Sequence, residues 1–171
     1  MAEKVIPVKV ALRIRPLINK EICDGCRECM EIMPNEPQVT IGIGSDRAFT
    51  YDYVFGPTSQ QEELYYNVVE PLLERFFNGY NATVLAYVQT GSGKTYSMGT
   101  CAAMNVTDGS EEVDNGVIPK VINDLFCRID HLKEKYDFLI KASFLEVSTC
   151  YSTLYNVYTR NTLLNFKNSL N

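Results

Sequence analysis

The sequence predicts an α/β fold in which helices pack against a mainly parallel sheet. Two observations lead to this prediction. Strand and helix patterns alternate along residues 1–147, and a glycine-rich segment stands between an apolar run and a helical segment. Alternating strands and helices favour a parallel sheet, because each helix carries the chain back to the end where the next strand begins. Ligands of such sheets bind at the carboxyl ends of the strands.

The composition is that of a single soluble domain. Of the 171 residues, 46% are hydrophobic and 22% are charged, and the net charge is -5. The chain therefore lacks the positive charge that nucleic-acid binding requires. No apolar run approaches the ~20 residues that cross a bilayer, and the first residues do not form a signal-peptide core. We expect a cytosolic chain with no nucleic-acid or membrane partner.

Two segments near the start alternate in the period-two manner of β-strands. The first covers residues 8–14 and stops at Arg15-Pro16. The second covers residues 49–55 and is closed by Gly56-Pro57. A small hairpin is expected between Cys29 and Gly44. These segments supply the first strands of the sheet.

Two helices follow from apolar spacing. Ser59 and Glu62 match a capping box, which predicts that a helix begins there and ends at Asn78-Gly79, with a kink at Pro71. Its apolar stripe consists of Leu64, Tyr65, Val68, Leu72 and Phe76. A second helix is predicted over residues 118–132, with Pro119 in its first turn. Its apolar positions are Ile118, Ile122, Leu125, Ile129 and Leu132.

Three further segments complete the organisation. Residues 83–88 are almost uninterruptedly apolar, which predicts a parallel strand buried on both faces. Residues 138–147 predict a fourth strand. Residues 148–171 are rich in Ser, Thr, Asn and Tyr and show neither period, so they are expected to be a weakly structured tail.

Three cysteines stand at the spacing of a metal or iron–sulfur ligand set: Cys23, Cys26 and Cys29. The set lacks a fourth ligand, because Met33 stands where another cysteine would follow. The single histidine, His131, lies far along the chain in a charged stretch and is expected at the surface. Reduced thiols of a cytosolic protein are favoured over a metal site.

A phosphate-binding loop is the strongest functional signal. Residues 88–95 match G-x-x-x-x-G-K-[ST] at every fixed position but the first, where valine replaces glycine. A strand pattern leads in and a helix leads out, so that backbone N–H groups converge at a helix N-terminus. The predicted site residues are Val88, Gln89, Thr90, Gly91, Ser92, Gly93, Lys94 and Thr95.

Individual loop residues have distinct predicted roles. Gly91 and Gly93 leave room for phosphate oxygens, Lys94 reaches the β- and γ-phosphates, and the Thr95 hydroxyl ligates magnesium. Val88 is expected to lower nucleotide affinity, because a β-branched residue crowds the loop and resists unusual backbone angles.

The loop belongs to a longer pattern that resembles the kinesin motor signature. Residues 79–87 read GYNATVLAY, and residues 89–98 read QTGSGKTYSM. Arg13-Ile14-Arg15-Pro16 is similar to the kinesin R-x-R-P element, and residues 49–55 are similar to the strand that follows it. The local sequences of residues 36–39 and 81–83 are most similar to those of the fourth, chromokinesin-like, kinesin family.

The resemblance implies a P-loop NTPase-type three-layer sandwich of which residues 1–147 form a partial motor domain. Residues 148–171 are then a divergent tail of unknown role. ATP and Mg²⁺ are the implied ligands, Lys94 and Thr95 the implied catalytic residues, and Thr95 the metal ligand. Arg13, Arg15 and Pro16 are expected beside the adenine, with Tyr96 on its other side. The implied partners are microtubules, in the cytoplasm and cytoskeleton, and dimerisation of the full-length protein is left open.

The sequence departs from the family in two respects. The S-S-R and D-x-x-G loops that kinesins use to sense the γ-phosphate do not occur in it, so the loop alone is not expected to hydrolyse ATP at a useful rate. After Glu146 the kinesin pattern gives way to Val147-Ser148-Thr149-Cys150. Alternative splicing, a diverged duplicate and a gene-model error all remain open. We expect the isolated chain to be marginally stable or to aggregate, because strand edges would lack partners.

Three functions therefore stand as alternatives. The first is the ATP-binding part of a microtubule motor that couples hydrolysis to movement. The second is a nonmotile nucleotide-binding or interaction fragment, which Val88 and the absent loops favour. The third is a small P-loop kinase, against which the long aromatic signature argues.

Overall fold

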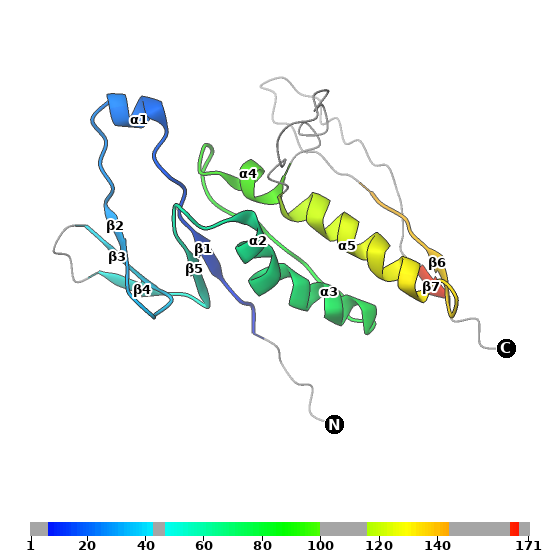
Figure 1. Cartoon of the computed structure of the whole chain (residues 1–171). Helices are drawn as coiled ribbons and strands as arrows, with labels where there is room; N and C mark the ends of the chain where they lie inside the picture. Colours follow the sequence, from blue (N-terminus) through cyan, green and yellow to red (C-terminus); the bar gives the residue numbers. More distant parts are fainter. Residues whose placement is uncertain (1–6, 43–46, 100–115, 144–164, 168–171) are drawn as a thin grey trace, which may run out of the picture. The chain divides into compact units, whose positions relative to one another are not determined.

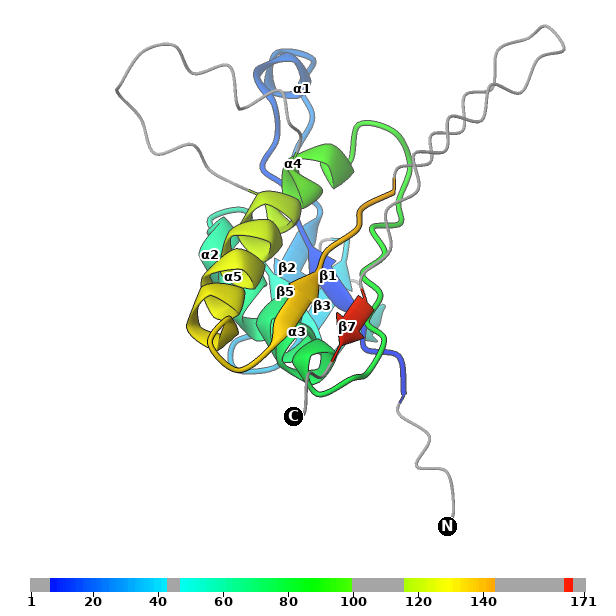
Figure 2. The ribbon, with the colours of Figure 1, turned by 90° about the vertical axis from the view of Figure 1, so that its right-hand side faces the viewer.

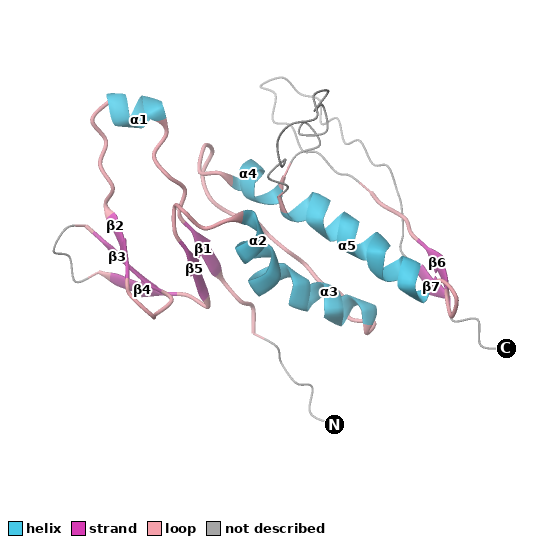
Figure 3. Ribbon diagram, viewed as in Figure 1, coloured by secondary structure: helices cyan, strands magenta, loops and turns pink. Residues whose placement is uncertain are grey.

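The computed structural model describes residues 7–42, 47–99, 116–143 and 165–167. The chain forms two units, Met1–Val121 and Ile122–Asn171. Among its described residues, the first unit contains two sheets, five short helical segments and the start of a longer helix (Figures 1 and 3). The described helices include none with the length and apolar character of a membrane span.

A parallel strand pair is the centre of the first unit. β1 (Ala11–Arg13) pairs with β5 (Tyr53–Phe55), with Ala11 opposite Tyr53 and Arg13 opposite Phe55. The predicted strand over residues 8–14 is therefore confirmed at its centre and is shorter than expected. The parallel strands and the helix over residues 61–77 that packs against them (Figure 2) agree with the predicted α/β class.

The predicted hairpin region is an antiparallel sheet of three strands. β2 (Met30–Ile32), β3 (Gln38–Ile41) and β4 (Ala48–Thr50) lie in that order. The single strand predicted over residues 49–55 is wrong, because the chain bends between β4 and β5. At the bend, the Asp52 carboxylate accepts a hydrogen bond from the Val10 N–H at 2.8 Å, and the Asp52 N–H donates to the Val10 carbonyl at 3.0 Å. These contacts to Val10, which is distant in the sequence, thus place the two halves of one alternating segment in different sheets.

The first predicted helix is present but begins differently. α2 (Gln61–Leu64), η1 (Tyr65–Val69) and α3 (Glu70–Phe77) follow one another without a break. The predicted capping box is wrong: the first turn has no side-chain cap, and the Ser59 hydroxyl accepts a hydrogen bond from the Gly56 N–H at 3.2 Å. The hydroxyl therefore serves the preceding turn. The helix ends at Asn78 and Gly79, as predicted, with Gly79 at φ 88°.

The segment η1 is a π-helical turn directly before Pro71, which lies in the first turn of α3. A proline lacks the N–H for the bond to residue i−4, and its ring collides with that carbonyl in a regular helix. The wider turn relieves this collision. It also shifts the buried row, because the extra residue rotates the following turns. Tyr65, Val69 and Leu73 are buried, whereas the predicted Val68, Leu72 and Phe76 are half-buried.

The second predicted helix is confirmed as α5 (Val117–Leu132). Its buried residues are Val117 and Leu125, whereas the predicted Ile118 and Ile122 are 42% and 46% exposed. In the first unit, Val117 joins a core that connects the β1 and β5 pair to the helix over residues 61–77. The buried members of this core are Phe55, Leu64, Tyr65, Val69 and Val117, and Ala11, Tyr53, Val68, Met98 and Val121 pack against it.

The buried strand predicted over residues 83–88 is wrong. This segment is irregular and mostly exposed, with Leu85 at 81% and Tyr87 at 87%. A strand buried on both faces needs neighbouring strands and covering helices. In the described part of the chain, no strand pairs with this segment, which explains why the predicted strand does not form.

In the second unit, β6 (Asp137–Leu139) pairs with β7 (Asn165–Lys167) in antiparallel fashion. The fourth predicted strand is therefore present only at its start, because residues 140–143 are irregular, and residues 144–147 lie outside the described residues. β7 falls in the tail that was expected to be weakly structured, so that expectation is wrong for these three residues.

The exposed apolar segment leads to a stability prediction. Leu85→Ser should change the unfolding free energy by less than about 0.5 kcal/mol and raise the concentration at which the chain aggregates, because its side chain lies in solvent. Val69→Ala should cost roughly 2 kcal/mol, because Val69 is 3% exposed in the core. Urea unfolding and light scattering measure the two effects. An equal loss of stability in both variants would contradict this assignment of core and surface.

Candidate nucleotide-binding site

The glycine-rich loop leads into a short helix, as the motif predicts. α4 (Lys94–Met98) follows directly, and the Ser97 and Gly99 N–H groups donate to the Gly93 and Thr95 carbonyls, each at 2.9 Å. Gly91 and Gly93 have φ of 81° and 99°, in the left-handed region that only glycine adopts without strain. The two glycines are therefore required by the backbone path itself.

The Lys94 ammonium lies over this loop. Its Nζ donates hydrogen bonds to the Val88 carbonyl at 2.6 Å and to the Gln89 carbonyl at 2.7 Å. The Ser92 hydroxyl also donates to the Gln89 carbonyl, at 2.8 Å. These contacts hold the positive charge beside the glycines, where an incoming phosphate group would meet it.

Val88 occupies the first motif position without backbone strain. Among the described non-glycine residues, Asn35 alone has a positive φ, and the Val88 side chain is 50% exposed. The expected resistance to unusual backbone angles therefore does not arise at Val88. Its effect on nucleotide affinity stays a prediction that rests on crowding by its side chain.

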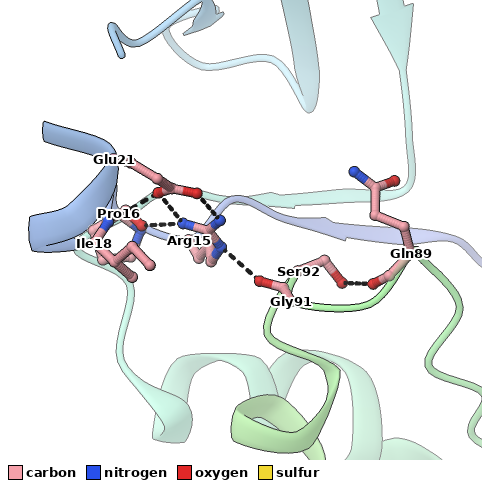
Figure 4. Close-up of polar contacts among 7 residues, drawn as sticks. All are labelled: Arg15, Pro16, Ile18, Glu21, Gln89, Gly91 and Ser92. Atoms are coloured by element: carbon pink, nitrogen blue, oxygen red, sulfur yellow. Dashed lines mark hydrogen bonds and ion pairs between the residues drawn. The ribbon is translucent and has the colours of Figure 1, made fainter. Parts of the chain in front are cut away.

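Arg15 connects the loop to α1 (Asn19–Cys23) through three of its nitrogens (Figure 4). Its Nη1 and Nη2 donate to the two Glu21 carboxylate oxygens at 2.8 and 2.6 Å, and its Nε donates to the Gly91 carbonyl at 3.0 Å. The Pro16 carbonyl accepts a further bond from Nη1 at 2.9 Å. Arg15 thereby fixes the position of the loop relative to the end of β1.

Glu21 also caps the start of α1, because its carboxylate accepts a hydrogen bond from the Ile18 N–H at 3.0 Å. The hydrogen bond from Arg15, followed by that from Ile18, lowers the pKa of this carboxyl from 4.5 to about 2. The same pair raises the pKa of the Arg15 guanidinium. Both shifts favour the charged forms, so the ion pair persists at neutral pH.

Arg13 lies beneath α4 rather than on an open strand edge. Its guanidinium carbon is 5.0 Å from the centre of the Tyr96 ring. Its Nη1 donates to Gln61 Oε1 at 2.6 Å and to the Ser97 hydroxyl at 3.1 Å, and its Nη2 donates to the Ser59 carbonyl at 3.4 Å. Since Arg13 and Tyr96 contact each other directly, a base cannot lie between them in this arrangement.

Gln61 is the residue of this region that the sequence did not indicate. Its side chain is 1% exposed, and its Nε2 donates to the Tyr96 carbonyl at 2.8 Å. The signal for it is its spacing of four residues from Tyr65, which places it on the buried row of the helix.

The remaining candidates divide between the loop and the surface. Thr90 and Thr95 are exposed beside the glycines, where the Thr95 hydroxyl could ligate a cation held by phosphate oxygens. The cysteines at positions 23, 26 and 29 are free and exposed, and His131 is exposed as predicted. Within the described ranges, no three acidic, cysteine or histidine residues are grouped to hold a metal.

The Arg15 and Glu21 pair leads to a pH prediction. Because the pKa of Glu21 is depressed in the folded chain, the pair stabilises the fold fully above pH 4.5, and this stabilisation is lost as the pH falls towards 2. Glu21→Gln should therefore be less stable than the parent above pH 4.5, and the difference should shrink on acidification. Urea unfolding across this range measures it, with Glu63→Gln, an exposed carboxylate of α2, as control. A difference that does not change with pH would contradict the pairing.

Comparison with known proteins places this geometry in a family. The family model described as "Kinesin motor domain" matches residues 13–162. Over 144 residues the chain is 52% identical to the chromosome-associated kinesin KIF4A of Homo sapiens, covering 84% of this chain and 11% of that protein. Over 141 residues it is 48% identical to the kinesin-like protein KIN-4C of Arabidopsis thaliana, covering 82% of this chain and 10% of that protein. These relatives confirm the resemblance to the fourth kinesin family.

A solved structure supports the same conclusion at the level of the fold. The chain is similar to a structure of Drosophila NOD and bovine tubulin docked into a map of nucleotide-free NOD complexed to the microtubule. The TM-score is 0.65 and the identity 27%, and the match covers 82% of this chain and 45% of that one. This likeness confirms the predicted fold class, and the chain forms part of such a domain. The chain spans about a tenth of its curated relatives, and by its sequence and fold it belongs to the kinesin motor domain family.

Proposed function

We propose that this chain is the ATP-binding part of a kinesin-type microtubule motor. The observation that carries the proposal is the loop over residues 88–93. Two glycines with positive φ lead directly into α4, and the Lys94 ammonium lies over the loop. A glycine-rich turn before a helix offers backbone N–H groups to an anion, and the Lys94 ammonium adds a positive charge beside them, which suits a triphosphate.

The residues present fit Mg²⁺ and ATP. A Cβ added at Gly91 would meet nothing within 4 Å, so the backbone is open to phosphate oxygens at this point. In the proposed complex, the Lys94 ammonium would leave the Val88 and Gln89 carbonyls for phosphate oxygens, and the exposed Thr95 hydroxyl would hold Mg²⁺. Bound Mg²⁺ supplies charge neutralisation to the phosphates. Lys94 and Thr95 are accordingly the proposed catalytic residues.

The base is proposed to lie near the end of β1. Pro16 follows Arg15 there, and the Tyr96 side chain is 55% exposed at the start of α4. An aromatic ring with solvent access offers a stacking surface to adenine. Arg13 lies against the Tyr96 ring and supports it, and Arg15 holds the loop at Gly91. In this proposal Arg13 supports the Tyr96 ring, and that ring is the surface that contacts the base.

The partner and the location follow from the family. A structure similar to this chain contains NOD complexed to the microtubule. We propose that the full-length protein binds microtubules in the cytoplasm and cytoskeleton, and couples ATP hydrolysis to movement along them. Its dimerisation stays a prediction.

A nonmotile nucleotide-binding fragment is the second candidate. Val88 favours it, because the isopropyl group stands at the position of the first motif glycine. Exposure of the apolar segment over residues 83–88 also favours a chain that acts in association with another protein.

Nucleotide affinity tests the proposed site. Lys94→Ala should weaken binding of a fluorescent ATP analogue with Mg²⁺ roughly 10- to 100-fold, the effect of losing a charged hydrogen bond. Lys133→Ala, which changes an exposed lysine in the turn after α5, should leave the affinity unchanged. Equal dissociation constants for the parent and Lys94→Ala would reject the site.

The effect of Val88 is a separate prediction. Val88→Gly should tighten binding of the same analogue several-fold, because removing the isopropyl group relieves crowding beside the phosphates. Titration by fluorescence anisotropy measures the change. If valine and glycine give the same dissociation constant, Val88 does not impair the site.

Microtubule co-sedimentation distinguishes the two candidate functions. The full-length protein should pellet with microtubules in the presence of a nonhydrolysable ATP analogue, and less of it should pellet when ATP is hydrolysed. A protein that binds nucleotide but never pellets with microtubules would favour the nonmotile alternative.

A further inference from the structure

Gln61 is a buried amide with both ends of its side chain hydrogen-bonded. The side chain is 1% exposed, although it stands in the first turn of α2. Its Oε1 accepts from Arg13 Nη1 at 2.6 Å, and its Nε2 donates to the Tyr96 carbonyl at 2.8 Å. A buried amide is costly unless both its donor and its acceptor are satisfied, so these two bonds matter to the fold.

The two bonds connect three elements that are far apart in the sequence. Arg13 ends β1, Gln61 begins α2, and Tyr96 lies in α4. The Arg13 guanidinium reaches α4 again through the Ser97 hydroxyl and the Tyr96 ring. Two residues of α4 are thus held by the strand and the helix of the neighbouring core.

α4 depends on such contacts for its orientation. It has five residues, and helices this short are not stable in isolation. No residue of α4 is buried, although Met98 packs partly against the core. The same helix carries Lys94 and Thr95, so whatever orients α4 also orients the two side chains proposed to meet the phosphates and the metal.

We infer that Gln61 is a positioning residue for nucleotide binding. It holds α4 through the Tyr96 carbonyl and holds Arg13 against the same helix, and thereby sets where Lys94 and Thr95 lie relative to β1. This inference rests on the proposed function. Gln61 itself is buried and does not touch the nucleotide, so its effect is transmitted through Arg13 and α4.

A role in packing alone makes a different prediction. Gln61→Met keeps the length and approximate volume of the side chain but removes both hydrogen bonds. Gln61→Glu keeps an acceptor for Arg13 but cannot donate to the Tyr96 carbonyl when ionised. Leu73→Ala, in α3, is the matched control, because Leu73 is 6% exposed and lies outside the contacts to α4.

The test uses the 171-residue chain at a temperature where circular dichroism shows each variant folded. Binding of the fluorescent ATP analogue with Mg²⁺ and hydrogen exchange of the Ser97 and Gly99 amides without nucleotide are both measured. Gln61→Met should weaken binding roughly tenfold, the effect of one to two lost hydrogen bonds, and should speed exchange in α4. Gln61→Glu should also weaken binding and speed exchange in α4, to a smaller degree. This variant provides the test if Gln61→Met does not fold.

Leu73→Ala should lower the melting temperature with little effect on affinity or on α4 exchange. If Gln61→Met or Gln61→Glu binds as tightly as the parent with unchanged exchange, the positioning role is wrong. If affinity falls in step with the melting temperature in every variant, Leu73→Ala included, the positioning role of Gln61 is wrong as well. If the parent chain itself does not bind the analogue, the proposed function fails and this inference falls with it.

Discussion

The hydrogen bonds of the Arg13 guanidinium are the contacts on which the arrangement of the first unit depends. They join the end of β1 to Gln61 of α2 and to Ser97 of α4, and the guanidinium also lies on the Tyr96 ring. A half-buried guanidinium is costly to desolvate, and its acceptors must therefore stay in place. Because those acceptors come from separate elements, satisfying one charge fixes the mutual position of strand and helices.

Contacts of shorter range hold the glycine-rich loop beside β1 and α4. Gly91 and Gly93 provide the backbone path, Lys94 donates to the loop carbonyls, and Arg15 holds the Gly91 carbonyl while pairing with Glu21. The loop is therefore attached near the end of β1 at two places, at Gly91 through Arg15 and at α4 through Arg13. Under the proposed function, a bound triphosphate would draw the Lys94 ammonium away from the loop carbonyls.

Features set by local sequence were predictable, and features set by distant partners were not. The glycine-rich loop, α5 and the early hairpin followed from spacing and from special residues such as Gly93 and Pro119. The bend at Asp52 depends on Val10, and the burial of Gln61 depends on Arg13, contacts that no local pattern reveals. Residues 83–88 had the composition of a buried strand, but burial requires neighbouring strands that the described part of the chain does not provide.

The proposed phosphate site consists of backbone N–H groups of the loop and the Lys94 ammonium. A crystal structure of the chain with Mg²⁺ and a nonhydrolysable ATP analogue tests this directly. Phosphate oxygens should lie against the loop between Gly91 and Thr95, and Lys94 Nζ should contact them instead of the Val88 and Gln89 carbonyls. An analogue bound elsewhere, or a loop without phosphate in which Lys94 keeps both carbonyls, would contradict it.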